Sequence, residues 1–304
     1  MANRHECFVL LRTGWRPPMA EIAAAMQQRY PELGRVAGTD APAESGMPGT
    51  LLLDGVTVSV TIVNAPYPLE QMFAPVRLLN HVDPESLVAA QLAYVMLGVE
   101  GPDVDQGMIG KGAAEQAEVA AAYAALLTLI AGTICAQAPA LGAFWSESWR
   151  LMPPDTMTDA AERVMEGELP LDVWISYAEV KGNRAGGPDN RAMLSFGLRR
   201  FCGREVEVAG APMSLAAMEK LARAHADRLR AGNVPMDNDG YDAPGGSGSG
   251  GGGGRGILRM VDRFMRPRQP ALVIVPPDSS VDPETLEMKG AKKSGIAGRL
   301  FGRR

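Results

Sequence analysis

A glycine- and serine-rich run near the C-terminus constrains the organisation of this chain more than any other feature. Residues Gly245–Gly256 are almost all Gly or Ser, with Arg255 as the one charged side chain. Such a segment has almost no apolar surface to bury and behaves as a flexible coil. The sequence therefore predicts three parts: a globular domain over residues 1–242, a flexible linker over 243–256 and a C-terminal tail over 257–304.

The globular part mixes strand-like and helix-like segments. Val56–Val63 alternates apolar and polar residues, and the preceding Asp54-Gly55 pair predicts a tight hairpin with Leu51–Leu53. The other expected strands are Cys7–Leu11, Leu92–Val99, Gly142–Leu151, Leu171–Val180, Ala192–Phe201 and Glu205–Val208. The expected helices are Met19–Tyr30, Gly112–Ala138, Asp155–Glu166 and Ser214–Ala231. We expect Asp155 or Thr156 to cap the third of these, and Ser214 and Gly232 to cap the two ends of the fourth. This order predicts an α+β fold, with a mixed or antiparallel sheet covered by helices, and two ferredoxin-like halves are one possible arrangement.

One segment has the length and composition of a membrane span. Val119–Ala138 contains no charged residue, although polar side chains and Gly132 interrupt it. No Lys or Arg closely flanks the segment, so the usual orientation signal is missing. We therefore expect an apolar helix in a soluble core.

The cysteines and the N-terminal residues indicate the compartment. Cys7, Cys135 and Cys202 are far apart and each lies in an apolar run, which favours buried thiols over a disulfide framework or a zinc site. The first apolar stretch is short and is bracketed by Glu6 and Arg12, which is not typical of a signal peptide. We expect a cytoplasmic protein without a metal or another cofactor.

A glycine-rich segment offers one candidate ligand site. Gly107–Gly112 leads into a predicted helix, and the free amides of a helix N-terminus can hold an anion. The segment departs from a phosphate loop, because only two residues separate Gly107 from Gly110 and a glycine follows Lys111. An anion site at Gly110, Lys111 and Gly112 is one hypothesis, and an ordinary glycine-rich helix start is the other.

Two acidic segments are further candidates for a functional site. Glu205 and Glu207 share one face of a predicted strand, where paired carboxylates could transfer protons or bind a metal. A solvated strand face accounts for the same pattern, and we favour it. Residues 236–242 are rich in carboxylates but lack the spacing of a calcium loop, so we expect a turn there.

The tail carries a basic and amphipathic pattern. Its apolar residues fall at helical spacing from Ile257 to Met265, with arginines on the other side, which predicts a helix over 257–266. Ala271–Val275 predicts a short strand, and no acidic residue follows Glu287. The residues that we expect to contact a partner are Ile257, Met260, Val261, Phe264, Arg299 and Phe301. This pattern suits a protein groove or an anionic membrane surface, and no motif supports nucleic acid. The alternative is that the helix docks on the globular domain.

Several segments together resemble a known family. They are Leu169–Ile175, Met193–Gly197 and Gly203–Glu207, preceded by the strands around Leu10-Leu11 and Ala143–Trp145. The set, over roughly residues 6–240, resembles a bacterial family of uncharacterised domains, the domain of unknown function four-two-six-one. The resemblance implies a cytosolic α+β domain, brings no catalytic residue, and points to interaction, immunity or secretion-associated proteins.

The distribution of charge completes the sequence-based hypothesis. The net charge is −5, but residues 255–304 carry 11 basic and 5 acidic side chains, whereas residues 1–254 carry 19 and 30. We expect a non-enzymatic protein-binding domain, of an adaptor, immunity or secretion-associated kind, with a basic interaction tail whose deletion changes the melting temperature little. The alternative is an enzyme or small-ligand binder with an anion site at the Gly107–Gly112 helix start.

Overall fold

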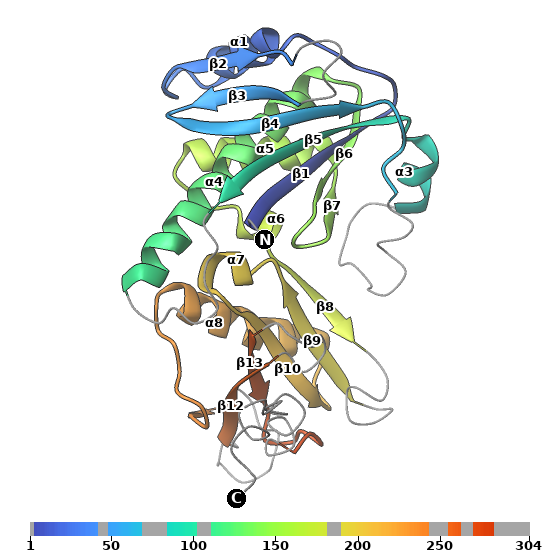
Figure 1. Cartoon of the computed structure of the whole chain (residues 1–304). Helices are drawn as coiled ribbons and strands as arrows, with labels where there is room; N and C mark the ends of the chain where they lie inside the picture. Colours follow the sequence, from blue (N-terminus) through green and yellow to red (C-terminus); the bar gives the residue numbers. More distant parts are fainter. Residues whose placement is uncertain are drawn as a thin grey trace, which may run out of the picture. The chain divides into compact units, whose positions relative to one another are not determined.

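The chain folds into two compact units. The structure is a computed structural model (Figure 1), which describes residues 3–41, 48–68, 84–101, 111–180, 190–242, 255–262 and 270–282. The first unit comprises Met1–Ala178 and Phe196–Cys202, and the second comprises Glu179–Ser195 and Gly203–Arg304. Both units combine helical segments and strands, and each sheet is largely antiparallel, so the α+β prediction is confirmed. The two sheets differ in strand number and strand order.

The first unit is built on a seven-stranded antiparallel sheet. Its strand order is β2-β3-β4-β5-β1-β6-β7. The strands are β1 (Asn3–Leu11), β2 (Val36–Thr39), β3 (Gly49–Leu53), β4 (Val56–Val63), β5 (Ala93–Gly101), β6 (Ala140–Trp145) and β7 (Arg150–Met152). The predicted hairpin joins β3 to β4, and Asp54 and Gly55 both adopt positive φ angles, 46° and 83°, as a tight two-residue turn requires.

Both faces of this sheet are covered. On one face of β1, Phe8 and Leu10 belong to an apolar cluster that includes Leu87 of helix α3 (Pro84–Ala90). On the opposite face Cys7, Val9 and Leu11 are fully buried. Helix α4 (Lys111–Gln137) packs on β1, β5 and β6, and on helices α1 (Met19–Arg29) and α5 (Pro154–Met165) (Figure 1). The central strand is therefore buried on both sides.

Helix α4 includes the uncharged segment noted in the sequence. Within the described residues, Glu115–Gln137 is the one helical stretch long and apolar enough to cross a membrane. Most of its apolar window lies buried within the structure, as in the core helix of a soluble protein. Leu127, Ile130 and Ile134 are fully buried, which agrees with the expectation of a core helix.

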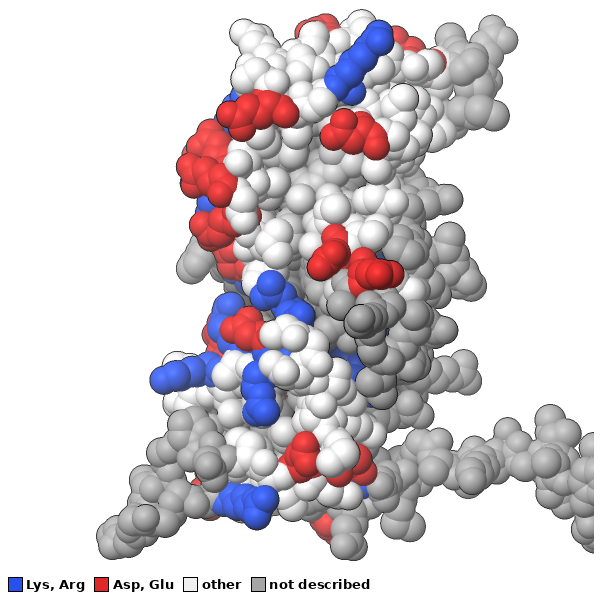
Figure 2. Space-filling view, turned by 90° about the vertical axis from the view of Figure 1, so that its left-hand side faces the viewer, with Lys and Arg blue, Asp and Glu red and all other residues white. Residues whose placement is uncertain are grey.

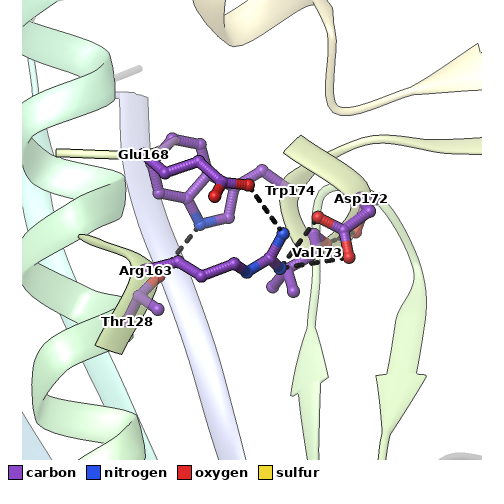
Figure 3. Close-up of polar contacts among 7 residues, drawn as sticks. Thr128, Arg163, Glu168, Asp172, Val173 and Trp174 are labelled. Atoms are coloured by element: carbon purple, nitrogen blue, oxygen red, sulfur yellow. Dashed lines mark hydrogen bonds and ion pairs between the residues drawn. The ribbon is translucent and has the colours of Figure 1, made fainter. Parts of the chain in front are cut away.

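A polar network joins α4 to the segment after α5 (Figure 3). The indole Nε1 of Trp174 donates to Thr128 Oγ1 at 2.9 Å, and Thr128 Oγ1 donates to the carbonyl of Ala124 at 2.8 Å. Nearby, the Arg163 guanidinium contacts Asp172 at 2.9 Å and Glu168 at 3.2 Å. The buried Trp174 thus satisfies its one polar atom, as a core tryptophan must.

The second unit contains most of a six-stranded sheet of order β11-β12-β13-β10-β9-β8, whose residues 176–178 and Phe196 fall in the first unit. Strand β13 pairs parallel to β10, and β12 pairs antiparallel to β13. The strands are β8 (Ser176–Val180), β9 (Arg191–Phe196), β10 (Glu205–Ala211), β11 (Gly240–Asp242), β12 (Arg255–Asp262) and β13 (Pro270–Val275). Helix α8 (Leu215–Arg230) packs on β10. Its predicted caps are confirmed, since Ser214 accepts from the amide of Ala217 and Gly232 has a φ of 78°.

The predicted helix over 257–266 is wrong. Residues 255–262 form strand β12, and its residues Ile257 to Asp262 pair with β13. The sequence pattern misled because Leu258 and Met260 also alternate with Arg259, as a strand requires, and Arg259 is buried in spite of its charge. The described part of the predicted tail therefore belongs to the sheet of the second unit, and Arg255 and Gly256 of the predicted linker begin that strand.

Other sequence-based boundaries also need correction. The predicted strands Leu171–Val180 and Ala192–Phe201 each include a short helical turn, α6 (Leu171–Trp174) and α7 (Arg199–Cys202). The predicted strand Gly142–Leu151 is two strands, β6 and β7. Helix α5 begins at Pro154 after Pro153, and no side-chain cap from Asp155 or Thr156 is present. Proline is common at the first helical position because its ring fixes a helical φ and it has no N–H to satisfy there.

Candidate functional site

The site residues expected from the sequence do not gather in one place. Gly110 lies outside the described residues, and Lys111 and Gly112 are the first two residues of α4, with side-chain surroundings outside the description. Ile257 and Met260 are half-buried in β12, and Val261 belongs to the same strand. Phe264, Arg299 and Phe301 lie outside the described residues. The structure therefore leaves the partner-binding hypothesis untested, and of the predicted tail it describes residues 257–262 and 270–282.

The paired carboxylates are buried. Glu205 and Glu207 both lie on β10 and are 5% and 2% exposed, so the interpretation as a solvated strand face is wrong. The hydroxyl of Ser195 donates to Glu205 Oε2 at 2.7 Å and accepts from the amide of Val206 at 2.7 Å. No sequence pattern indicated that Ser195 would anchor this carboxylate.

The acidic segment before β11 is a turn, as predicted. Asp239 accepts from the amide of Met236, and Asn238 adopts a positive φ of 67°. Asp237 accepts from the amide of Met260 at 2.8 Å and from Arg259 Nε at 3.1 Å. Its carboxylate thereby compensates the buried Arg259 charge. Within the described residues no three His, Cys, Asp or Glu side chains gather as a metal site would require.

The buried thiols and His5 are held in unreactive forms. Cys7 and Cys135 are free and buried, which confirms the sequence-based expectation for these two, whereas Cys202 is half-buried. Burial raises the pKa of Cys7 and raises that of Cys135 to about 12, so neither is a ready nucleophile. Burial, together with the Arg200 charge, lowers the pKa of His5 to about 4. Its Nδ1 lies 3.8 Å from Glu147.

A groove in the second unit brings together basic and aromatic side chains that no sequence motif predicted. It lies where α8 faces β11 and the first residues of β12, and its volume is about 640 Å³. We call it the basic groove and define it by its rim of Lys220, Ala224, Arg228, Gly240 and Arg255 and its floor of Leu221, His225 and Tyr241. The rim residues are exposed and the floor residues are buried.

The helix supplies two cations on one side of the groove. Lys220 and Arg228 are eight residues apart, with Ala224 midway, so the three lie along one side of α8. Leu221 and His225 follow on the neighbouring row and are buried. The other arginines of α8 are already paired, Arg223 with Glu219 and Arg230 with Asp227.

Two glycines make room for the opposite wall. Tyr241 on β11 pairs with Gly256 on β12, and a side chain at Gly256 would overlap the Tyr241 ring. In the same way, a Cβ at Gly240 would overlap the Arg255 guanidinium. The two strands therefore each carry one large side chain over a glycine of the neighbouring strand, which places the Arg255 charge across from α8.

The basic groove concentrates positive charge. Within the residues that the structure describes, no carboxylate lies within ion-pair distance of Lys220, Arg228 or Arg255. Figure 2 faces the side on which Figure 1 draws α8, and it shows several Lys and Arg side chains on that face. Uncompensated cations around a concave surface attract anions.

The floor of the groove is neutral and aromatic. His225 and Tyr241 meet edge to face with ring centroids 5.3 Å apart. Burial, together with the Arg228 charge, lowers the pKa of His225 to about 4, so the imidazole is neutral near pH 7. Burial also raises the pKa of Tyr241, and its buried hydroxyl has no hydrogen-bond partner among the described residues.

The comparisons with known proteins add no further constraint. No protein-family model, no curated protein and no solved structure matches the chain.

Proposed function

We propose that the chain is a binding protein whose second unit holds an anionic group in the basic groove. The observation that carries this proposal is the convergence of Lys220, Arg228 and Arg255, from two different elements, on one cavity with no described carboxylate to neutralise them. Arginine guanidinium groups suit phosphate and carboxylate oxygens, because they donate two parallel hydrogen bonds.

The lining of the groove favours binding over catalysis. Among its described lining residues there is no carboxylate and no Ser, Thr or Cys hydroxyl or thiol. Its imidazole, His225, has a pKa of about 4 and is a weak base near pH 7. We therefore expect the groove to bind a ligand that contacts the cations without catalysing its reaction.

Paired and unpaired arginines on the same helix provide a matched test. We expect inorganic pyrophosphate to bind the full chain in isothermal titration calorimetry at low salt, because it is small and carries several charges. Replacing Lys220→Gln and Arg228→Gln together removes both helix cations of the groove and should weaken binding at least tenfold. The control is Arg223→Gln with Arg230→Gln, which removes the same charge from the same helix but outside the groove.

The two double variants give opposite predictions. The control variant should bind pyrophosphate within about twofold of the unmodified chain, since its arginines already contact Glu219 and Asp227. Equal weakening by both variants would show that only the overall charge of α8 matters. No binding by the unmodified chain would contradict the proposal outright.

The charge of the tail favours a second candidate function. Residues 288–304 carry six basic side chains and no acidic one, a composition that suits an acidic surface of a partner protein. In this proposal the chain is a cytosolic protein-binding domain, of an adaptor, immunity or secretion-associated kind, as the family resemblance implies. Partner capture from a host lysate by the full chain, but not by a chain that ends at Asp282, would support it. Equal capture by both would contradict it.

A further inference from the structure

The arrangement of the basic groove also indicates the kind of anion that it fits. Lys220 and Arg228 are eight residues apart on α8, which corresponds to about 12 Å along the helix axis. Both side chains are exposed at the rim. A ligand that contacts both cations along the groove therefore needs two anionic groups at a similar separation, or one group to which both side chains bend.

The lining at the middle of the basic groove is apolar, and the residue on α8 there has a small side chain. Ala224 lies halfway between the two cations and contributes only a methyl group. Below it, the floor is formed by the buried Leu221, His225 and Tyr241. The middle can therefore receive a small apolar group, and burying it there is favourable.

An extended peptide supplies this order of groups. Residues i, i+2 and i+4 of an extended chain point to the same side, and four residues span about 13 Å. A segment with acidic, apolar and acidic residues at these positions places its carboxylates at the spacing of Lys220 and Arg228. The exposed rim leaves room for the rest of such a chain to continue in solvent, whereas most small-molecule sites enclose their ligand.

We infer that the basic groove binds an extended acidic segment of a partner protein, in which two carboxylate side chains flank one apolar side chain at alternate positions. This inference rests on the proposed function and names the occupant of the same groove. Arg255, on the wall opposite α8, is placed to contact either a carboxylate or a backbone carbonyl of the segment.

Synthetic peptides test the inference. The probe is acetyl-Ser-Glu-Ser-Leu-Ser-Glu-Ser-amide, and its affinity for the full chain is measured by calorimetry. One control peptide replaces Leu by Ser, and a second places the two Glu side by side. We expect each control peptide to bind at least tenfold more weakly, because the first loses the apolar contact and the second cannot span the two cations.

A substitution in the protein tests the apolar contact in the middle of the groove. Ala224→Leu fills the middle of the groove with a side chain that favours the helix as well as most residues do, so α8 stays folded. We expect this variant to bind the probe peptide at least tenfold more weakly than the unmodified chain. Competition between pyrophosphate and the peptide should also be observed.

The possible outcomes separate the two proposals. Binding of pyrophosphate without binding of the probe peptide, or equal binding of all three peptides, would overturn this inference and leave the proposed function standing. Equal affinity of the Ala224→Leu variant for the peptide would also overturn it. Failure of both ligands to bind would overturn the two proposals together.

Discussion

Buried polar side chains in this protein find their partners far away in the sequence. Arg259 contacts Asp237, 22 residues earlier, and Trp174 donates to Thr128, 46 residues earlier. Neither pair follows a local motif, so the sequence could mark Trp174 as a core residue but could not name its partner. The basic groove could not be predicted from the sequence for the same reason, because Lys220, Arg228 and Arg255 become neighbours only when α8 meets β12.

The hydrogen bond between Trp174 and Thr128 makes the first prediction. Thr128→Val removes the acceptor and leaves the buried indole N–H without its partner (Figure 3). We expect a loss of about 1–3 kcal/mol in the free energy of unfolding, measured by urea denaturation. Thr158→Val is the control, since Thr158 donates only to the Pro154 carbonyl of its own helix, and it should cost less than about 0.5 kcal/mol. Equal losses in both variants would contradict this account.

The depressed pKa of His5 makes a prediction about pH. The imidazole has a pKa of about 4 in the folded state, against 6.5 for an unperturbed histidine. As the pH falls from 6.5 to 4, the unfolded chain therefore binds a proton at this residue before the folded chain does, and the free energy of unfolding falls. For His5 the loss over this window is roughly 2–3 kcal/mol, and it is absent above pH 6.5.

The matched variant isolates this contribution. Replacing His5→Gln removes the titrating group, so stability should fall less steeply between pH 6.5 and pH 4 than in the unmodified chain. Urea denaturation at a series of pH values measures the difference. A pH dependence identical to that of the unmodified chain would show that His5 titrates normally in the folded state.

At the scale of elements, short sequence motifs correctly predicted the features that depend only on neighbouring residues. The Asp54-Gly55 turn and the Ser214 cap were predicted correctly, because each depends on backbone geometry within a few residues. The segment 257–262 was predicted wrongly, since its apolar residues fit both a helix and a strand. Pairing with β13 decided between them, and that pairing is a tertiary contact.

Strands β12 and β13 belong to the sheet of the second unit. The expectation that deleting the tail changes the melting temperature little is therefore reversed. Strand β13 lies between β12 and β10, and its residues Ala271, Leu272 and Val273 are fully buried. A chain that ends at Asp242 lacks both strands, so we expect the second unit to lose its cooperative thermal transition. A chain that ends at Asp282 keeps every described strand and should retain the transition. An unchanged melting curve for the shorter chain would contradict the sheet order.

At the scale of the whole molecule, the two units are interleaved along the chain. Residues Phe196–Cys202 belong to the first unit, although the segments before and after them belong to the second. Within the first unit Phe201 stacks on Trp174 with ring centroids 5.5 Å apart, and Phe196 stacks on Trp149 at 5.6 Å. The sequence predicted one domain over 1–242, because no linker marks the places where the chain crosses from one unit to the other.

This interleaving predicts that the first unit is incomplete without its returning segment. A fragment that ends at Ala178 lacks both phenylalanines, so its aromatic core should be destabilised. In the full chain Phe201→Ala should lower the free energy of unfolding by about 3–5 kcal/mol, as for other buried aromatic residues. Urea denaturation checks this value. A loss below about 1 kcal/mol would show that the stacking on Trp174 contributes little.

The net charge of −5 conceals a local group of three positive side chains, those that line the basic groove. The most direct test of its role is the NMR signal of the His225 imidazole during a pyrophosphate titration near pH 7. The account predicts that this signal shifts and saturates and that the pKa of His225 rises, because a bound anion offsets the nearby Arg228 charge. The buried His5 of the first unit should stay unchanged. A His225 signal that does not move while pyrophosphate binds would contradict the account.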